Sequence, residues 1–293
     1  MRRNLIHIIL GGFMLFLTAC DETISLDLPQ GDEDIVIYGY IEQDSVPVVS
    51  LTKSLPVFAT IDVSKLQKSF VQGAQVTLDN GDTTIELQEY SVPIGDFNYR
   101  FYSVPPSLYG VYKGEVGKTY DLTVQAEGKT LTASTTIPTP VPLDSIWWLP
   151  HPDKDNDSLV VLQVRFKDVP GEANYARYFT KRNSEPFYPG YFASVFNDSF
   201  LEGQAVEFAL PRGQDRNDTI NNDTYSYFWH GDTIEVKWCS IDRPHYDFWT
   251  TLESDQNNQG NPFGMPTRIM SNVEGGLGIW GGYGASYSKL IVP

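Results

Sequence analysis

The sequence predicts a mostly β protein, in which an N-terminal immunoglobulin-like β-sandwich is followed by a second β-rich domain with one short helix near residues 243–255. Short runs of β-branched and aromatic residues recur along the chain, and many alternate apolar with polar positions, as half-buried strands do. Clusters of Gly, Pro, Asn and Asp separate these runs. The composition, with 41% hydrophobic and 20% charged residues, is that of a folded chain rather than a disordered one.

The first domain is predicted at residues 34–139. Its expected strands are 35–41, 46–52, 74–78, 83–87, 99–102, 120–126 and 131–137. The stretch 57–70 lacks strict alternation and is interpreted as a loop with one helical turn. Asn80-Gly81 lies between two alternating runs, and both residues tolerate the positive φ of a tight hairpin turn. Seven short strands in about 105 residues are typical of an immunoglobulin-like sandwich.

Alternate prolines at Pro138, Pro140 and Pro142 mark the expected boundary between the domains, because proline removes ladder donors and favours extended backbone. The second domain is predicted at residues 143–293. Its expected strands are 144–148, 159–167, 175–181, 188–195, 205–210 and 233–241, with a polar loop rich in Asn and Asp at 213–223.

A helix is predicted at residues 243–255. Asp242 directly precedes this segment and Pro244 lies in its first turn, and both are signals of a helix start. Tyr246, Trp249 and Leu252 follow at helical spacing. The glycine-rich end of the chain, 275–284, is interpreted as a place of tight turns and close backbone approach.

Residues 1–19 read as a lipoprotein signal peptide. A basic start is followed by an apolar run at 5–17 and by Leu17-Thr18-Ala19-Cys20, which matches the lipobox of bacterial lipoproteins. The apolar run is shorter than the roughly 20 residues that span a bilayer as a helix. We therefore expect cleavage before Cys20, lipidation of Cys20, and a tether at residues 20–33 that anchors the protein to a membrane.

The two acidic residues after the lipidation site, Asp21 and Glu22, resemble the surface-export signal of Bacteroidota lipoproteins. In enterobacteria an Asp at this position instead resembles an inner-membrane retention signal. A third interpretation is that Asp21 and Glu22 are the start of a solvated tether.

The charge of the mature chain excludes one class of partner. Removal of residues 1–19 takes away Arg2 and Arg3, so 19 of the 21 basic residues remain against 37 acidic ones and the net charge is −18. Such a chain is not expected to bind nucleic acid through a basic patch. Cys239 is the thiol that remains after lipidation, so no internal disulfide is expected. Alternation places Cys239 on the Glu235/Lys237 side of its strand.

The sequence does not carry the motifs of common catalytic sites. His151, His230 and His245 form no His-Glu-x-x-His or His-x-His pair, and there is no Gly-x-Ser-x-Gly elbow or phosphate-binding glycine loop. We therefore expect a non-enzymatic protein without a cofactor. Asp242 and Asp247 flank His245 like an acid–base cluster, but their place at a helix start is explained by capping.

Two weaker site candidates lie at the start of the second domain. Asp153, Asp155 and Asp157 alternate as ligands of a calcium loop do, but position six is Ser158 rather than Gly, and position twelve is Val164 rather than Glu. A looser Ca²⁺ site and a solvated loop are both compatible with this pattern. Trp147 and Trp148 are candidates for stacking on a ligand such as a sugar ring, although neighbours on a strand face opposite ways and packing accounts for at least one of them.

Several segments together resemble one known family. They are 35–41, 141–146, 241–252 (Ile-Asp-Arg-Pro-His-Tyr-Asp-Phe-Trp-Thr-Thr-Leu), 261–266 (Asn-Pro-Phe-Gly-Met-Pro) and 271–283. With the lipobox, this set is similar to the Bacteroidota outer-membrane lipoproteins known as domain of unknown function 4249. The resemblance covers nearly the whole mature chain and carries over no catalytic residues.

The resemblance implies a location and a partner. Members of this family are commonly encoded beside TonB-dependent receptors, so it implies a SusC-like β-barrel transporter as partner and an outer-membrane position facing the cell exterior. We therefore expect a non-enzymatic surface lipoprotein that is an accessory subunit of such a transporter or of a related outer-membrane complex. The alternatives are a surface glycan- or peptide-binding module, hydrolytic or not, and a subunit of an envelope-assembly machine.

Overall fold

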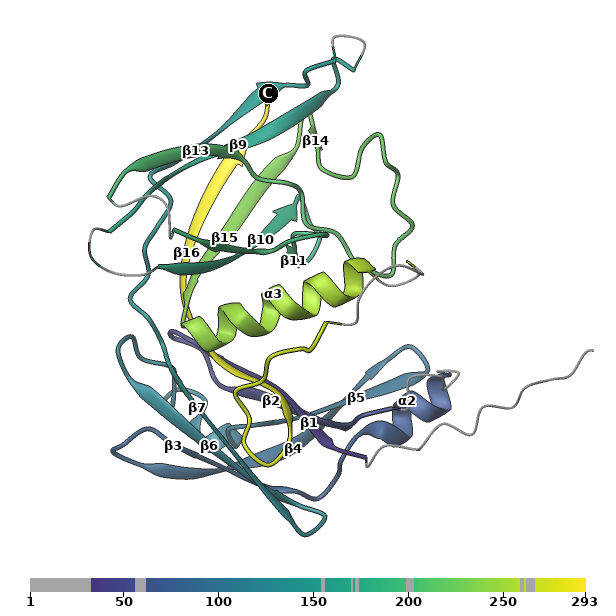
Figure 1. Cartoon of the computed structure of the whole chain (residues 1–293), viewed down its shortest axis with the longest axis vertical. Coiled ribbons are helices and arrows are strands. Elements are labelled where there is room, and N and C mark those ends of the chain that lie inside the picture. The colour runs from purple at the N-terminus through teal and green to yellow at the C-terminus, as the bar shows by residue number, and fades with distance from the viewer. Residues whose placement is uncertain are drawn as a thin grey trace, which may run out of the picture. The chain divides into compact units, whose positions relative to one another are not determined.

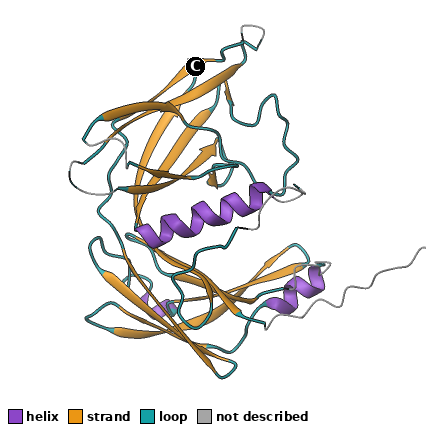
Figure 2. Ribbon diagram, viewed as in Figure 1, coloured by secondary structure: helices purple, strands orange, loops and turns teal. Residues whose placement is uncertain are grey.

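The computed structural model describes residues 33–55, 62–153, 156–169, 171, 174–198, 203–258, 261 and 267–293. Residues 33–293 belong to one compact unit. Within its described part the secondary structure is mostly β, with the two α-helices α2 (Val63–Ser69) and α3 (Arg243–Asn258), and this confirms the predicted fold class (Figure 2). No helix in the described part is long and apolar enough to cross a membrane.

Seven strands build a β-sandwich at the N-terminal side of this unit. They are β1 (Ile35–Glu42), β2 (Val48–Lys53), β3 (Gln75–Asp79), β4 (Thr84–Ile94), β5 (Phe97–Ser103), β6 (Thr119–Ala126) and β7 (Lys129–Thr136). The neighbour order is β1-β2-β5-β4-β3-β6-β7. The long strand β4 pairs with β3 through its first residues and with β5 through the remainder, so it passes from one layer to the other.

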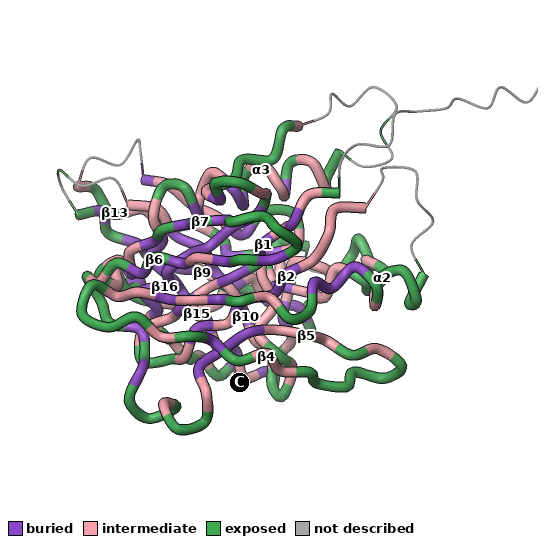
Figure 3. The backbone as a smooth tube through the Cα atoms, turned by 90° about the horizontal axis from the view of Figure 1, so that it is seen from below, coloured by how far each residue is buried: buried purple, intermediate pink, exposed green. Residues whose placement is uncertain are grey.

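Alternation along these strands produces the first core. Ile35, Ile37 and Ile41 of β1 are buried, and so are Tyr120 and Leu122 of β6. The second strand of the predicted hairpin behaves in the same way, since its alternate residues from Leu131 to Ile137 are buried. Figure 3 shows the buried positions along the strands and the exposed ones mainly along the connections.

A second pair of layers follows. One layer contains β8 (Ser145–Pro150), β9 (Leu159–Lys167), β13 (Ala205–Ala209) and β14 (Phe228–Trp229), and the other contains β10 (Tyr175–Arg182), β11 (Tyr188–Pro189), β12 (Val195–Asn197), β15 (Thr233–Ile241) and the end of β16 (Leu277–Ile291). Their facing residues, among them Val164, Phe166, Tyr178 and Trp238, form the second core. The predicted strand 188–195 is broken, because residues 191–194 pass between β11 and β12 without strand structure.

The C-terminal strand β16 joins both sandwiches (Figure 1). Residues 277–283 pair in parallel with β1, and residues 284–291 pair antiparallel with β15. Trp280 is fully buried in the first core, where its Nε1 donates to the carbonyl oxygen of Tyr120 at 2.9 Å. The predicted division into domains at 34–139 and 143–293 stays a prediction. In the structure, β16 supplies each sandwich with a strand.

The sequence interpretation of 275–284 as tight turns was wrong in part, since most of it is strand, but the expected close approach is confirmed. A Cβ on Gly284 would lie 2.1 Å from the carbonyl oxygen of Pro138, and one on Gly281 would lie 2.3–2.6 Å from three ring atoms of His245. Glycine is unfavourable in strands, so its presence here reflects neighbours that leave no room for a side chain.

Helix α3 packs against β10, β12 and β16. It begins at Arg243 as predicted and ends three residues beyond the expected end, at Asn258. The Asp242 carboxylate accepts a hydrogen bond from the backbone N–H of His245 at 2.9 Å, which is the geometry of a helix N-cap. Its other oxygen accepts from the Thr135 hydroxyl of β7 at 2.8 Å, so the cap also fastens α3 to the first sandwich.

Candidate functional site

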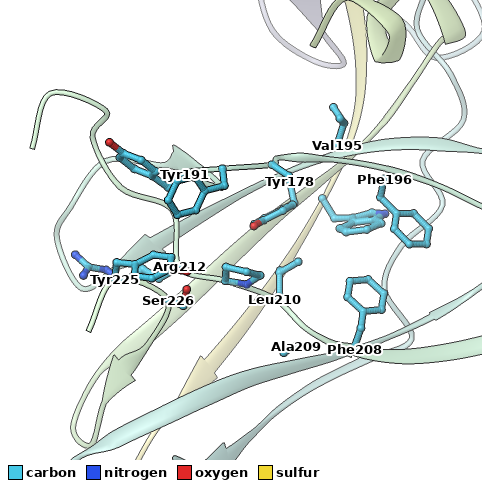
Figure 4. A pocket seen from close by; sticks show the side chains of 14 residues that line it. Tyr178, Tyr191, Val195, Phe196, Phe208, Ala209, Leu210, Arg212, Tyr225 and Ser226 are labelled. Atoms are coloured by element: carbon cyan, nitrogen blue, oxygen red, sulfur yellow. The ribbon is translucent and has the colours of Figure 1, made fainter. Parts of the chain in front are cut away.

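A cavity of about 250 Å³ lies at the edge of the second sandwich (Figure 4). Its walls come from β10, β12, β13 and β15 and from the segments 191–195, 209–212 and 225–226. The lining residues are Tyr178, Tyr191, Phe192, Ala193, Val195, Phe196, Phe208, Ala209, Leu210, Pro211, Arg212, Tyr225, Ser226 and Trp238. The cavity is therefore mainly aromatic and apolar, as small-molecule sites usually are.

Two of the wall residues lie side by side on neighbouring strands. Tyr178 on β10 is the register partner of Trp238 on β15, and both point to the inner side of the sheet. Phe196 and Phe208 stack on each other with ring centroids 5.3 Å apart, and both rings lie within 6.4 Å of the Trp238 ring. This aromatic cluster forms one end of the cavity.

Tyr178 and Trp238 each bury a polar atom that is unpaired. Tyr178 is 5% exposed and Trp238 is 2% exposed. Neither the Tyr178 hydroxyl nor the Trp238 Nε1 has a hydrogen-bond partner among the described residues. In Figure 4 the Tyr178 hydroxyl is directed between Tyr191 and Leu210. A buried donor without a partner costs about 1–3 kcal/mol. Both atoms have less than 1 Å² of accessible surface, so the two rings line the cavity but their polar atoms do not face it.

The opposite end of the cavity is polar. Arg212 lies there beside Tyr225, and its Nη2 contacts both carboxylate oxygens of Glu185 at 3.2 Å. The predicted Asn/Asp-rich loop 213–223 starts directly after Arg212. From this loop Arg216 reaches Glu253 of α3 at 3.7 Å. The loop that the sequence marks as polar thus connects the cavity rim to the helix.

A buried hydrogen-bond chain lies behind the cavity, on the α3 side of the sheet. Arg177 donates from Nε to the Ser194 hydroxyl at 3.0 Å, and that hydroxyl donates to Glu253 at 2.5 Å. The Arg177 guanidinium also lies 3.3 Å from the centre of the Trp249 ring, which is a cation–π contact. This chain links the buried cation to a buried carboxylate and holds the segment 190–195, part of which lines the cavity.

Burial sets the protonation of the groups around this chain. It raises the pKa of Tyr178, and the nearby Glu253 charge acts in the same direction, so the Tyr178 hydroxyl keeps its proton. Burial, aided by Arg177, lowers the pKa of His245 to about 3, so this imidazole is neutral at physiological pH. The side chain of His245, on α3, therefore packs as a neutral ring beside Tyr283 of β16, and the two ring centroids are 4.7 Å apart.

The sequence-predicted lipidation and export residues, Cys20, Asp21 and Glu22, lie outside the described residues. So does Asp155, the middle member of the predicted calcium set, while Asp153 and Asp157 are described on either side of it. In the part of the chain that the structure describes, no group of three or more His, Cys, Asp or Glu side chains is arranged to hold a metal ion.

Trp147 and Trp148 lie on β8, and both are half-buried. Trp148 packs on the second core and makes an edge contact with His230 at 5.1 Å between centroids. Trp147 is on the opposite face of the strand, as the sequence requires. Neither tryptophan lines the cavity.

Cys239 lies on the predicted face of its strand, and the thiol is fully buried there in a cluster with Tyr283 and Ala285 of β16, against which Tyr246 of α3 also packs. Burial raises its pKa to about 12, which leaves it a packing residue rather than a nucleophile.

Comparison with known protein families assigns the chain to one of them. Residues 21–288 match the family described as Domain of unknown function (DUF4249). The chain belongs to the DUF4249 family. The segments 241–252 and 271–283 now have structural roles in this DUF4249 protein, because they form the capped helix α3 and the glycine-rich strand β16.

Other comparisons add little to the family assignment. No curated protein matches the chain. Among solved structures, a pullulanase type I from Bacillus subtilis str. 168, in complex with maltose, is 13% identical, with a TM-score of 0.20. The match covers 70% of the DUF4249 chain and 23% of the pullulanase.

Proposed function

We propose that this DUF4249 protein is a non-enzymatic binding lipoprotein of the outer membrane, tethered through Cys20, facing the cell exterior, and working as an accessory subunit of a SusC-like TonB-dependent transporter or a related outer-membrane complex. The observation that carries the binding role is the aromatic and apolar cavity of about 250 Å³. It offers contact area to a small apolar group. The polar groups next to it, Ser194, Glu253 and Arg177, are engaged with one another.

The distance between the lipid anchor and the compact unit is compatible with this proposal. The lipobox ends at Cys20, and the described unit begins at Glu33. About a dozen residues therefore separate the lipid from the unit, a span of up to roughly 40 Å when extended. The mature charge of −18 disfavours direct contact with an anionic lipid surface, so the acyl chains supply the attachment. Asp21 and Glu22 support the outward-facing position.

A surface glycan- or peptide-binding role is the second candidate, and Trp147 is the observation that favours it. Trp147 is half-buried on the outer side of β8, whereas Trp148 is engaged with His230. A glycan array with Trp147→Ala and Trp148→Ala variants tests this candidate. The glycan-binding role requires that the unmodified protein binds a glycan on the array and that Trp147→Ala loses this binding while it stays folded.

The accessory role is tested on the full-length protein in its native cells. The lipoprotein, tagged at its C-terminus, is extracted in mild detergent, purified and examined by mass spectrometry, and protease treatment of intact cells reports its exposure. We expect co-purification of a TonB-dependent β-barrel in stoichiometric amount, and cleavage of the lipoprotein on intact cells. A Cys20→Ala variant is the control, because it is expected to lose the anchor. Recovery of the lipoprotein without a barrel would overturn the proposed partner.

A further inference from the structure

We propose that the β4–β5 hairpin, together with α2, lies against a lipid surface and orients the anchored protein on its membrane. The proposal rests on the lipid anchor of the proposed function and adds a second, non-covalent contact to it. It does not depend on the receptor. Three features support it, namely the apolar face of the hairpin, the place where the tether joins the compact unit, and the local charge.

The outer half of the hairpin has one face of apolar and aromatic side chains. In the antiparallel register, the residues of β4 and β5 on this face stand opposite each other in pairs, so their side chains point to the same side. Ile94 is 60% exposed and Val92 is 45% exposed. The four aromatic residues of the face are half-buried. The hairpin face consists of Tyr90, Val92, Ile94, Phe97, Tyr99 and Phe101, and none of them is charged.

The described part of the chain covers this face only in part. There, residues 88–94 and 97–101 pair with each other and with no third strand. Helix α2 packs against the hairpin, since the Gln67 side chain accepts from the backbone N–H of Asn98 at 2.8 Å and the Phe70 ring lies 5.5 Å from that of Phe97. A two-stranded hairpin is marginally stable in water, and contiguous exposed apolar surface is typical of contact with a protein or a membrane. The hairpin face is therefore available to an external surface.

Helix α2 extends the hairpin face. Val63 and Leu66 lie on the same helical stripe as Gln67 and Phe70, the two residues that contact the hairpin. Val63 is 55% exposed and Leu66 is 40% exposed. The hairpin face together with Val63 and Leu66 is called the platform below.

The tether joins the compact unit beside the platform. Asp34, at the start of the unit, accepts a hydrogen bond from the backbone N–H of Ser54 at 2.8 Å. Two residues before Ser54, Thr52 forms a β-bridge with Phe70, which packs on the hairpin. Figure 1 shows the start of β1 close to α2 and β5. Because about a dozen residues, or up to roughly 40 Å, separate the unit from Cys20, the platform stays within reach of the lipid surface that holds the anchor.

The local charge favours a lipid surface at this place. Residues 62–70 and 88–103 contain three acidic and three basic residues and so have no net charge, whereas the whole chain carries −16. The acidic chain is repelled by an anionic membrane, and its approach is least unfavourable at an element without net charge. Tyrosine beside aliphatic side chains, as in the platform, is typical of residues at a membrane interface.

The proposal is tested with the purified lipoprotein reconstituted into vesicles of phosphatidylcholine, a neutral lipid. Ile94→Cys and, as a matched control, Ile291→Cys each receive a polarity-sensitive dye on the new thiol. Ile291 is 66% exposed and lies at the end of β16 in the second sandwich. Cys239 is buried and the proposed lipidation occupies Cys20, so neither competes for the dye. Nitroxide groups on the lipid acyl chains quench a dye that enters the bilayer.

We expect the dye at position 94 to be quenched and its emission to shift to shorter wavelength, and the dye at position 291 to show neither change. Elements that lie on a membrane enter it by roughly 5–10 Å, so a nitroxide near the headgroup end of the acyl chain should quench most.

A second reporter separates the platform from the dye itself. The dye is placed on Val63→Cys, and the hairpin is changed by Val92→Asp with Ile94→Asp. These charges are expected to abolish quenching at position 63, because a charged group is costly to transfer from water into an apolar layer. Ile291→Asp is the control and should leave the quenching unchanged. Circular dichroism checks that each variant is folded.

Equal quenching at positions 94 and 291, or no quenching at 94, would overturn the lipid contact. A spectral shift at 94 that occurs in native membranes but not in pure lipid would replace the lipid with a protein partner. A shift that grows with the protein-to-lipid ratio would replace it with a second copy of the chain. Flotation of the vesicles reports the anchor separately. A lipoprotein that floats without quenching refutes this inference alone, whereas one that does not float refutes the anchor and this inference with it.

Discussion

The contact between Gly281 and His245 allows a quantitative test of why β16 is rich in glycine. Replacement of Gly281 by Ala places a methyl group 2.3 Å from Cε1, 2.4 Å from Nδ1 and 2.6 Å from Nε2 of the His245 ring. The ring cannot move away freely, because His245 is 1% exposed and packs beside Tyr283. Gly281 has no left-handed backbone conformation, so the cost of the substitution is one of space.

The expected cost follows from overpacking. Additional methyl groups in a packed core usually destabilise by about 1–3 kcal/mol, and three contacts below 3.0 Å place Gly281→Ala at the upper end, about 2–3 kcal/mol. For a chain of this size each kcal/mol lowers the melting temperature by roughly 2–4 °C. We therefore expect a decrease of about 4–12 °C, measured by thermal and denaturant unfolding followed by circular dichroism.

A control and a double variant separate this explanation from a general effect of glycine replacement. Gly110 has no atom within 4 Å of an added Cβ and no positive φ, so Gly110→Ala is expected to be neutral or to stabilise by about 0.4–1 kcal/mol. His245→Ala vacates the space that the Gly281→Ala methyl needs. The double variant should therefore be more stable than the sum of the two single effects by more than about 0.5 kcal/mol. Additivity would refute the steric reasoning.

Three further outcomes are expected. His245 has a pKa of about 3 in the folded protein against its ordinary 6.5, so the unfolded chain binds a proton first as the pH falls. The free energy of unfolding therefore decreases between pH 6.5 and 3, by about 1.4 kcal/mol per pH unit from this group. In denaturant titrations from pH 7 to 4, the free energy of unfolding of His245→Gln should depend less steeply on pH. Asp242→Ala should destabilise by about 1–2 kcal/mol through loss of the α3 cap, while Asp242→Asn keeps most of it, and equal losses in thermal unfolding would contradict the capping role. Cys239, in a chain with Cys20→Ser, should react with a thiol reagent only after denaturant is added, and fast reaction of the folded protein would contradict its burial.

Local patterns in the sequence predicted the parts of the fold that depend on neighbouring residues. Alternation placed the hairpin from Tyr120 to Ile137 with its buried face correctly assigned, and Asp242 with Pro244 marked the start of α3. These features are set within one or two turns or strands, where residue chemistry and spacing decide the outcome.

Other features depend on partners far away in the chain. Glycines at 275–284 indicate turns when read alone, and only the neighbours of β16, such as His245 and Pro138, explain why a strand there lacks side chains. Cys239 was assigned to the correct face, but its burial comes from residues of β16 and α3, such as Tyr283 and Tyr246, which the alternation of β15 does not report.

The cavity belongs to the same group of features. Tyr178 and Trp238 are 60 positions apart and read as ordinary strand residues. Their shared place in the cavity wall arises from the register of β10 against β15, and residues 191–195 line one side of the cavity. A polar loop at 213–223 was the one local signal near the site.

The place of β16 has a consequence for the order in which the protein matures. Val36 pairs with Leu277, so one edge of the first sandwich is completed by residues that are synthesised more than two hundred positions later. Until they arrive, the edge of β1 presents unpaired backbone groups, which in sheets invite pairing with other chains. Such distant pairings also slow folding. A chain that crosses a membrane N-terminus first would therefore stay open until nearly all of it has emerged, and a product truncated before Leu277 would leave both halves with a missing strand at once.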